Sequence, residues 1–297
     1  MSATTDTPEA AAARWWPSAY GADDQIGALN HVDESKRLEA LSLVCAGRMY
    51  DLGRVLDETV PVFPGRYFRQ TLVTTAHHAN PEGGVGANQV NWITEQVTGT
   101  QQLGTHLDAL SHLQTGDRGY NGWRVSELAD TAGVRRLGVE TVPQIVTCGW
   151  LVDVPAVRGV ERLERGDVVG VEDLGGIEPA AGDAVFFHTG WGGQWDDSVA
   201  YLDGEPGPGC AVAHWLADRG VALTGCDTWS YGPVPAEDPE RPFAVPQHLN
   251  VHHGVFIVEN LDLSALAADG VRRFALVLTH PKLRGATGAW TSPIALV

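Results

Sequence analysis

The sequence predicts one mixed α/β domain, and three observations support this fold class. The chain has 297 residues and is 43% hydrophobic, so it is long enough to bury a sizeable core. Its 35 glycines and 17 prolines favour many turns over a helical bundle. Strand patterns outnumber helix patterns, and no internal repeat or interdomain linker is visible. We therefore expect residues 1–13, which are small and polar, to form a disordered tail, and residues 14–297 to form a single domain.

The helices are expected to be few and short. Asp33 is placed as the N-cap of the first one, which carries an apolar stripe on one face and ends at Gly47. The stripe consists of Leu38, Leu41, Val44 and Cys45. Two further helices are expected over residues 124–130 and 211–218.

Strands are expected where β-branched and apolar residues run together. One begins at Tyr50, and another contains Val90, Trp92, Ile93, Val97 and Thr98. Continuous apolar runs predict buried strands at 145–154, 183–191, 221–227 and 274–278. The segment 231–246 holds five prolines and several charges, so we expect it to form a lid or a surface excursion.

The overall charge and the cysteines exclude several classes of protein. The net charge is −17, from 37 acidic and 20 basic residues, which argues against a nucleic-acid partner. No apolar run of membrane-spanning length or signal-peptide character occurs, so no membrane partner is expected. The four cysteines, Cys45, Cys148, Cys210 and Cys226, form no CxxC pair. We read them as reduced thiols in apolar surroundings and expect a cytoplasmic protein.

The residues that carry chemistry gather between Gly99 and Gly122. His106 and Asp108 are two positions apart, so on an extended segment their side chains leave the same face, and Gln102 shares that parity. With His112 nearby, this set suits a divalent metal ion and an adjacent base. A solvated His–Asp pair or a hydrogen-bonded loop is the alternative. A strand before the set and a glycine cluster after it favour a site.

The segment Gly104-Thr105-His106-Leu107-Asp108, with His112 and Tyr120-Asn121-Gly122 after it, resembles the signature of the metal-dependent cyclase family, His-x-Gly-Thr-His-x-Asp-x-Pro-x-His. That family includes bacterial kynurenine formamidase and isatin hydrolase. Two positions depart from the motif, because Gln102 and Leu110 replace its first histidine and its proline. The resemblance implies a swivelling β/β/α domain with a partly closed, barrel-like sheet, and a homo-oligomer, a dimer or a tetramer.

The resemblance also extends to other segments of the chain. Residues 61–65, Pro-Val-Phe-Pro-Gly, are similar to a family turn near the substrate, and a plain rigid turn is the alternative. In the family, a histidine and a glutamate from the region of residues 247–261 complete the active site, and His248 and Glu259 match them. Glu259 has three open roles: holding a ligand water, orienting His248, or binding the metal directly.

These residues define the expected chemistry. His106, Asp108 and Gln102 are the candidate ligands of one ion, Mn²⁺ or Zn²⁺, and the amide oxygen of Gln102 shifts the preference towards manganese. Gln102 as a hydrogen-bond donor to a bound water is the competing interpretation. A bound ion activates water and polarises a carbonyl, and His112 serves as the base, with His248 and Glu259 in catalytic support.

The sequence thus predicts a metal-dependent hydrolase that cleaves a C–N or C–O bond of a small substrate, such as a cyclic amide, a lactone or an aryl formamide. A neutral substrate is favoured by the acidic surface. One or two of Trp15, Trp16, Trp92, Trp191 and Trp229 are expected to line its pocket. Two alternatives stay open: a metal-dependent cyclase or dehydratase, and a binding protein of the same family without catalysis.

Overall fold

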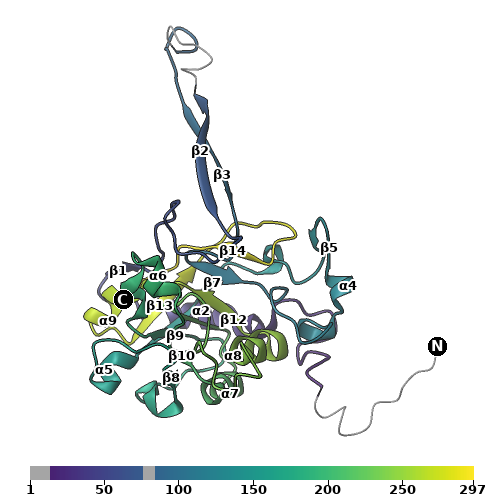
Figure 1. The fold of residues 1–297 in the computed structure, drawn as a ribbon, viewed down its shortest axis with the longest axis vertical. Helices are drawn as coiled ribbons and strands as arrows, with labels where there is room; N and C mark the ends of the chain where they lie inside the picture. Colours follow the sequence, from purple (N-terminus) through teal and green to yellow (C-terminus); the bar gives the residue numbers. More distant parts are fainter. Residues whose placement is uncertain (1–13, 76–83) are drawn as a thin grey trace, which may run out of the picture.

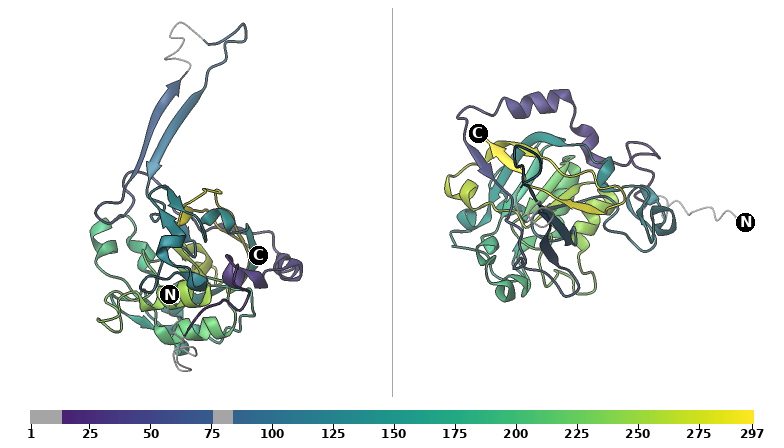
Figure 2. Two further views of the ribbon diagram at one scale, coloured as in Figure 1. Left: turned by 90° about the vertical axis from the view of Figure 1, so that its right-hand side faces the viewer. Right: turned by 90° about the horizontal axis from the view of Figure 1, so that it is seen from above.

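The structure is a computed structural model that describes residues 14–75 and 84–297. Its body is built around one nine-stranded sheet in the order β1-β15-β13-β7-β9-β11-β12-β4-β14 (Figure 1). The sheet is strongly curled, like half of a barrel (Figure 2). This confirms the expected mixed α/β domain with a partly closed, barrel-like sheet. The expected tail, residues 1–13, lies outside the described residues, as does the His77-His78 pair, which the sequence places in a polar loop.

The central strands β7, β9, β11 and β12 run parallel, and the strands on both sides of this group pair antiparallel. The bounds of the nine strands, in sheet order, are Met49–Asp51, Ile294–Leu296, Arg273–Leu278, Ile145–Asp153, Ala184–His188, Leu223–Cys226, Phe256–Glu259, His106–Asp108 and Gly288–Trp290. Three small two-stranded sheets accompany it: β2 Phe68–Thr75 with β3 Ile93–Gly99, β5 Ala129–Asp130 with β6 Gly133–Val134, and β8 Val168–Val169 with β10 Gly207–Pro208.

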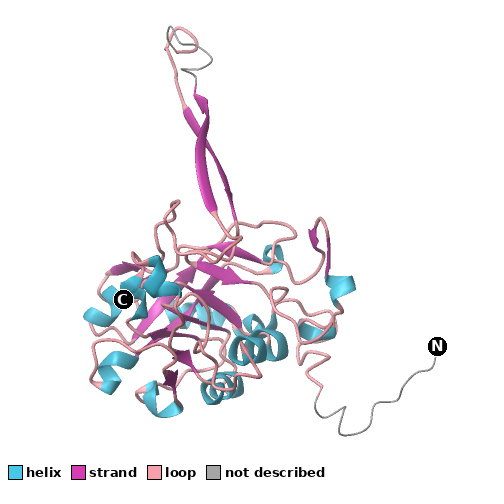
Figure 3. Ribbon diagram, in the orientation of Figure 1, coloured by secondary structure: helices cyan, strands magenta, loops and turns pink. Residues whose placement is uncertain are grey.

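The helices are short and surround the sheet (Figure 3). The α-helices are α2 Glu34–Leu41, α4 Val125–Leu128, α5 Val154–Arg158, α6 Ser198–Leu202, α7 Cys210–Asp218, α8 Ala244–Pro246 and α9 Ser264–Ala268. The 3₁₀ turns are η1 Gly27–His31, η2 Tyr120–Gly122, η3 Val139–Thr141, η4 Val171–Leu174 and η5 Trp191–Gln194, and η6 Gln247–His252 is a π-helix. Within the described residues, no helix has the length and apolar character needed to cross a membrane.

Alternation along β7 divides the apolar residues between the two faces of the sheet. Ile145 and Leu151 join the large core, together with the buried residues of β9, β11 and β12. Cys148 points the other way, where it meets Ala40 of α2 and Ala275 of β13 in a small second cluster. A strand buried on both faces explains the continuous apolar run that predicted it.

The predicted buried strands at 145–154, 183–191, 221–227 and 274–278 are confirmed as β7, β9, β11 and β13, and the helices at 124–130 and 211–218 as α4 and α7. Asp33 is the N-cap of α2, as expected, because its carboxylate accepts from the Lys36 backbone N–H. The predicted apolar stripe of this helix was wrong. The helix ends at Leu41, and Leu38 and Leu41 are exposed, because the face turned to the sheet carries Lys36 and Ala40.

Two smaller differences concern the cysteines and the strand that precedes the segment from Gly99 to Gly122. The four cysteines are free, but Cys45 is exposed and not in apolar surroundings. β3 begins at Ile93, so Val90 and Trp92 precede it, and its residues face solvent. β2 and β3 form a long arm that projects from the body (Figure 1).

The Lys36–Asp183 ion pair fastens α2 to the sheet. Lys36 Nζ lies 2.7 Å from Asp183 Oδ1, and both side chains are buried. Asp183 also accepts from Trp150 Nε1 and from the Ala180 backbone N–H. Removing one partner of a buried pair leaves the other charge without compensation.

We therefore expect Lys36→Met to lower the free energy of unfolding by about 3–5 kcal/mol, measured by urea denaturation. Arg48→Met is the matched control, because its ion pair with Asp269 is exposed on both sides and should contribute at most about 1 kcal/mol. An equal loss in the two variants would contradict the assignment of the buried pair.

Candidate active site

Strand β4 brings the candidate residues together. It lies between β12 and β14, and Glu259 of β12 stands opposite His106. Paired residues of neighbouring strands share a face, and Asp108 is two positions from His106, so all three side chains leave the same face of the sheet. The expected extended segment is therefore confirmed, with Leu107 pointing the opposite way into the core.

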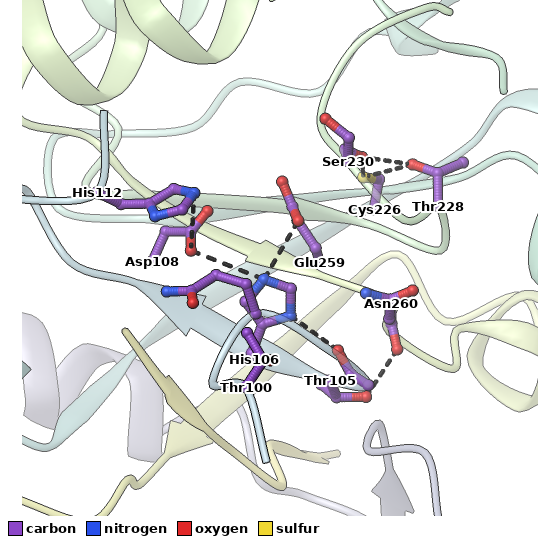
Figure 4. A network of polar contacts seen from close by, with 12 residues as sticks. Thr100, Thr105, His106, Asp108, His112, Cys226, Thr228, Ser230, Glu259 and Asn260 are labelled. Atoms are coloured by element: carbon purple, nitrogen blue, oxygen red, sulfur yellow. Dashed lines mark hydrogen bonds and ion pairs between the residues drawn. The ribbon is translucent and has the colours of Figure 1, made fainter. Parts of the chain in front are cut away.

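The three side chains converge at short range, and His112 lies at their edge (Figure 4). His106 Nε2 is 3.2 Å from Glu259 Oε2 and 3.7 Å from Asp108 Oδ1. His112 Nε2 is 4.0 Å from the same Asp108 oxygen. One donor atom from each of His106, Asp108 and Glu259 can be chosen so that all lie within 4.8 Å of one another, which is the spacing of ligands around one ion.

The orientation of His106 is set by its own backbone. Its Nδ1 lies 2.8 Å from the Gly104 carbonyl oxygen, so Nδ1 carries the proton and Nε2 presents a lone pair to the carboxylates. Gly104 has φ +55°, and a Cβ there would lie 2.0 Å from Leu56 Cδ2, so another residue would strain the backbone and displace the Leu56 side chain. Thr105 anchors the turn by donating from Oγ1 to the Asn260 carbonyl and accepting from the Arg54 backbone N–H.

Burial shifts the pKa of all three groups. It lowers the pKa of His106, raises the pKa of Asp108, and raises the pKa of Glu259 to about 7. His106 Nε2 and Asp108 Oδ1 are buried and receive no hydrogen bond from the part of the chain that the structure describes. Buried hydrogen-bond acceptors without a partner are costly in a protein interior. An imidazole nitrogen and two carboxylates fit a divalent metal ion, which would compensate that cost.

Gln102 reaches this site from an irregular segment, not from the strand. Residues 101–105 are bends, so the parity argument that placed it beside His106 was wrong, although its side chain does line the same cavity. Its Nε2 donates to Thr287 Oγ1 at 3.0 Å. Gly288, opposite Asp108, leaves the space for it, because a Cβ at residue 288 would lie 2.8 Å from Gln102 Nε2.

The cluster opens into a cavity of about 360 Å³. Its polar wall is formed by Arg66, Gln102, Asp108, His112, Ser230 and Glu259. Its apolar wall is formed by Phe63, Leu113, Trp229, Phe243 and Pro246, and the rings of Phe63 and Trp229 meet edge to face with centroids 4.5 Å apart. A cavity with one ionisable end and an aromatic wall is suited to a small, flat ligand.

The sequence predicted the segments that supply several of these lining residues, but it did not predict Arg66. The 61–65 turn supplies Phe63, Trp229 is one of the five tryptophans considered, and the 231–246 excursion contributes Phe243 and Pro246. Arg66 was missed, although it directly follows that turn. It donates to the Gln102 carbonyl at 2.9 Å, which holds its guanidinium at the cavity. A cation placed next to a rigid turn was the available signal.

The structure does not bring His248 to the cavity. It lies in the π-helix η6 and packs against His214 and His253, with ring centroids 4.1 and 4.4 Å apart. Burial, followed by its histidine neighbours, lowers the pKa of His248 to about 3. Glu259, His106, Asp108, His112 and Gln102 are thus brought together, and His248 stands apart.

Comparisons with known proteins identify the family and the fold. A family model described as "Putative cyclase" matches residues 50–233. A solved structure described as a novel cyclase is 26% identical, with a TM-score of 0.84 over 95% of this chain and 99% of its own. Isatin hydrolase A from Ralstonia solanacearum is 22% identical, with a TM-score of 0.62 over 84% and 92% of the two chains. A structure described as a potential metal-dependent hydrolase with cyclase activity is 19% identical, with a TM-score of 0.56 over 84% and 98%. No curated protein matches the chain.

We expect protein purified without chelator to carry about one divalent ion per chain, measured by elemental analysis, because one ion satisfies all three buried donors. His106→Ala and Asp108→Ala should lose that ion. His31→Ala is the matched control, since the His31 side chain hydrogen-bonds Tyr20 Oη and lies outside the cavity. Wild-type protein without metal, or a His106→Ala variant that keeps it, would overturn the assignment.

Proposed function

Because this chain belongs to the cyclase family, we propose that it is a metal-dependent hydrolase of small carbonyl compounds. The substrate is a cyclic amide, a lactone or an aryl formamide, and the scissile bond is C–N or C–O. One observation carries the proposal: a buried imidazole and two buried carboxylates share one face of the sheet beside a cavity, with His112 next to them.

A divalent ion, Mn²⁺ or Zn²⁺, would be held by His106, Asp108 and Glu259, with Gln102 contributing its amide oxygen. When bound, such an ion supplies Lewis acidity, which polarises a carbonyl and lowers the pKa of water. His106 donates its Nδ1 proton in a hydrogen bond to the Gly104 carbonyl. Its Nε2 lone pair therefore remains available to bind a metal ion. Direct binding is the role we choose for Glu259 among those considered, because its carboxylate lies nearest to His106 Nε2.

His112 is the residue placed to move a proton. Its side chain lines the cavity and is partly open to it, while its Nε2 stays 4.0 Å from Asp108 Oδ1. At that position, Nε2 takes a proton from the attacking water and returns it to the departing nitrogen or oxygen. His248 has no part in the proposal, since it packs among other histidines outside the cavity.

The rest of the cavity selects the substrate. Phe63 and Trp229 form an aromatic surface against which a flat ring can stack. Arg66 provides a fixed cation that can hold a carbonyl oxygen or the carboxylate of a product. Isatin hydrolase A, whose structure this chain resembles, is named for a bicyclic lactam of that shape, which makes aromatic lactams the first substrates to test.

Replacing the base should separate turnover from metal binding. We expect His112→Ala to lower kcat by about 10²–10⁴-fold while the metal content stays at the wild-type level, because a base acts on water without holding the ion. His31→Ala should leave both quantities unchanged. If His112→Ala releases the ion as readily as His106→Ala, then His112 is a ligand and its role must be reassigned.

The reaction class is tested in water enriched in oxygen-18, after a screen of aromatic lactams, lactones and formamides. Hydrolysis places one labelled oxygen in the product carboxylate, detected by mass spectrometry. A product formed without label, by elimination or ring closure, would replace the hydrolase with a lyase or cyclase. Metal-loaded protein that binds these compounds without turning them over would instead make it a binding protein.

A further inference from the structure

Glu205 carries a fully buried carboxyl group that the proposed chemistry does not use. It lies between α6 and β10, and its backbone exchanges two hydrogen bonds with Val234, at 2.9 and 2.8 Å. Its carbonyl also accepts from the Gly166 backbone N–H. Glu205 is not among the residues that line the cavity, nor does it belong to the group of candidate metal ligands. A carboxyl group is costly to bury, so its position calls for an explanation.

The side chain of Glu205 contacts the turn that carries the aromatic wall of the cavity. Its Oε2 accepts from the Ser230 backbone N–H at 3.2 Å. The carbonyl of the preceding residue, Gly204, accepts from Trp229 Nε1, also at 3.2 Å. Residues 204 and 205 therefore hold Trp229 twice, through its indole ring and through the peptide bond that follows it.

The same turn is held on its other side from β11. Thr228 Oγ1 donates to the Ser230 carbonyl at 2.8 Å, and Cys226 Sγ donates to the same oxygen at 3.0 Å (Figure 4). The Thr228 carbonyl accepts from the Asn260 backbone N–H at 2.8 Å. These bonds fix the carbonyl groups of the turn and leave the Ser230 N–H to Glu205, so the carboxyl group completes the set.

Burial decides the form in which Glu205 makes this contact. Burial, followed by the Glu259 carboxylate, raises the pKa of Glu205 well above its usual range. Oε1 has no hydrogen-bond partner within the described residues, while Oε2 accepts from Ser230, so the acid proton belongs on Oε1. Glutamine has the shape of such a neutral carboxyl group, and its amide oxygen can accept from the same N–H.

We propose that Glu205 is a positioning residue for the substrate, because it holds Trp229 opposite Phe63 as the aromatic wall of the cavity. The two rings meet with centroids 4.5 Å apart, a geometry that depends on where the Trp229 backbone lies. This inference rests on the proposed function, in which a flat substrate ring stacks on that wall. Loss of the acceptor would leave the Ser230 N–H buried without a partner, so the turn would shift and carry the wall with it.

Two substitutions of similar shape separate the hydrogen bond from the packing. Glu205→Met keeps the length of the side chain but removes the acceptor, and Glu205→Gln keeps the acceptor. On an aromatic lactam, Glu205→Met should raise KM about tenfold with kcat and metal content unchanged, because a ring contact is lost and not a step of the chemistry. Glu205→Gln should retain the wild-type KM.

Thr147→Val is the matched control. Thr147 is buried in β7, and its Oγ1 donates to the Gly182 carbonyl at 2.6 Å, away from the cavity. This variant loses a buried hydrogen bond of the same kind without touching the wall, so its KM should stay at the wild-type value. A raised KM in Thr147→Val would mean that KM reports general loss of stability, which would overturn the proposal.

The position of Trp229 can be measured without turnover. Protein labelled with 5-fluorotryptophan gives a fluorine NMR signal for this residue, assigned by its loss in Trp229→Phe. We expect the signal to shift in Glu205→Met and to stay in place in Glu205→Gln and Thr147→Val. If Glu205→Met does not fold, Glu205→Asp replaces it with the same expectation, because its carboxyl group is one methylene too short to reach the Ser230 N–H.

The fluorine signal separates this proposal from the proposed function. An unshifted Trp229 signal in Glu205→Met overturns the positioning role, whether or not the protein is a hydrolase. A shifted signal with unchanged KM overturns it too, as does a Glu205→Gln variant that behaves like Glu205→Met. If the wild type turns over no aromatic compound, the proposed function fails, and the dissociation constant of isatin, measured by calorimetry, replaces KM with the same tenfold expectation. A wild type that also fails to bind isatin overturns both.

Discussion

The organisation of this protein depends on the burial of three ionisable side chains on one face of a curled sheet. His106 and Asp108 come from β4 and Glu259 from β12, and the antiparallel register between these strands sets them side by side. Burial disfavours the charged form of each, which is why the pKa of the imidazole falls and the pKa values of both carboxyls rise. A cation bound among them would offset the cost of burying the charged carboxylates. The burial that the fold imposes therefore favours the proposed metal site.

The surroundings of these residues hold them in place with little freedom to adjust. Thr105 links the β4 segment to Asn260 and to Arg54, so two distant parts of the chain meet beside His106. Gly104 adopts a positive φ that favours glycine, and its carbonyl fixes the tautomer of His106. Side chains supported in this way would keep their geometry before any ion binds, which is the arrangement that favours selective metal binding.

The arm and the cavity are connected through the chain itself. Arg66 lies two residues before β2, and Gln102 lies three residues after β3. The two residues also contact each other, since Arg66 donates to the Gln102 carbonyl. The two strands of the arm therefore lead directly into the segments that carry these two side chains to the cavity.

The sequence by itself determined the features that depend on neighbouring residues. The His106-x-Asp108 spacing, the N-cap Asp33, and the apolar runs of β7, β9, β11 and β13 follow from backbone periodicity, which acts over a few residues. Glu259 was matched by its resemblance to a family position, and the register of β12 against β4 placed it beside His106. Only the tertiary structure decided what long-range packing controls. Lys36 and its ion pair with Asp183, not the leucines, set the orientation of α2, while η6 turns His248 towards other histidines. Arg66 lines the cavity and Ile93 remains exposed to solvent, and the local sequence predicted neither. Which surface a side chain contacts depends on residues far away in the chain, and the local sequence pattern carries no information about them.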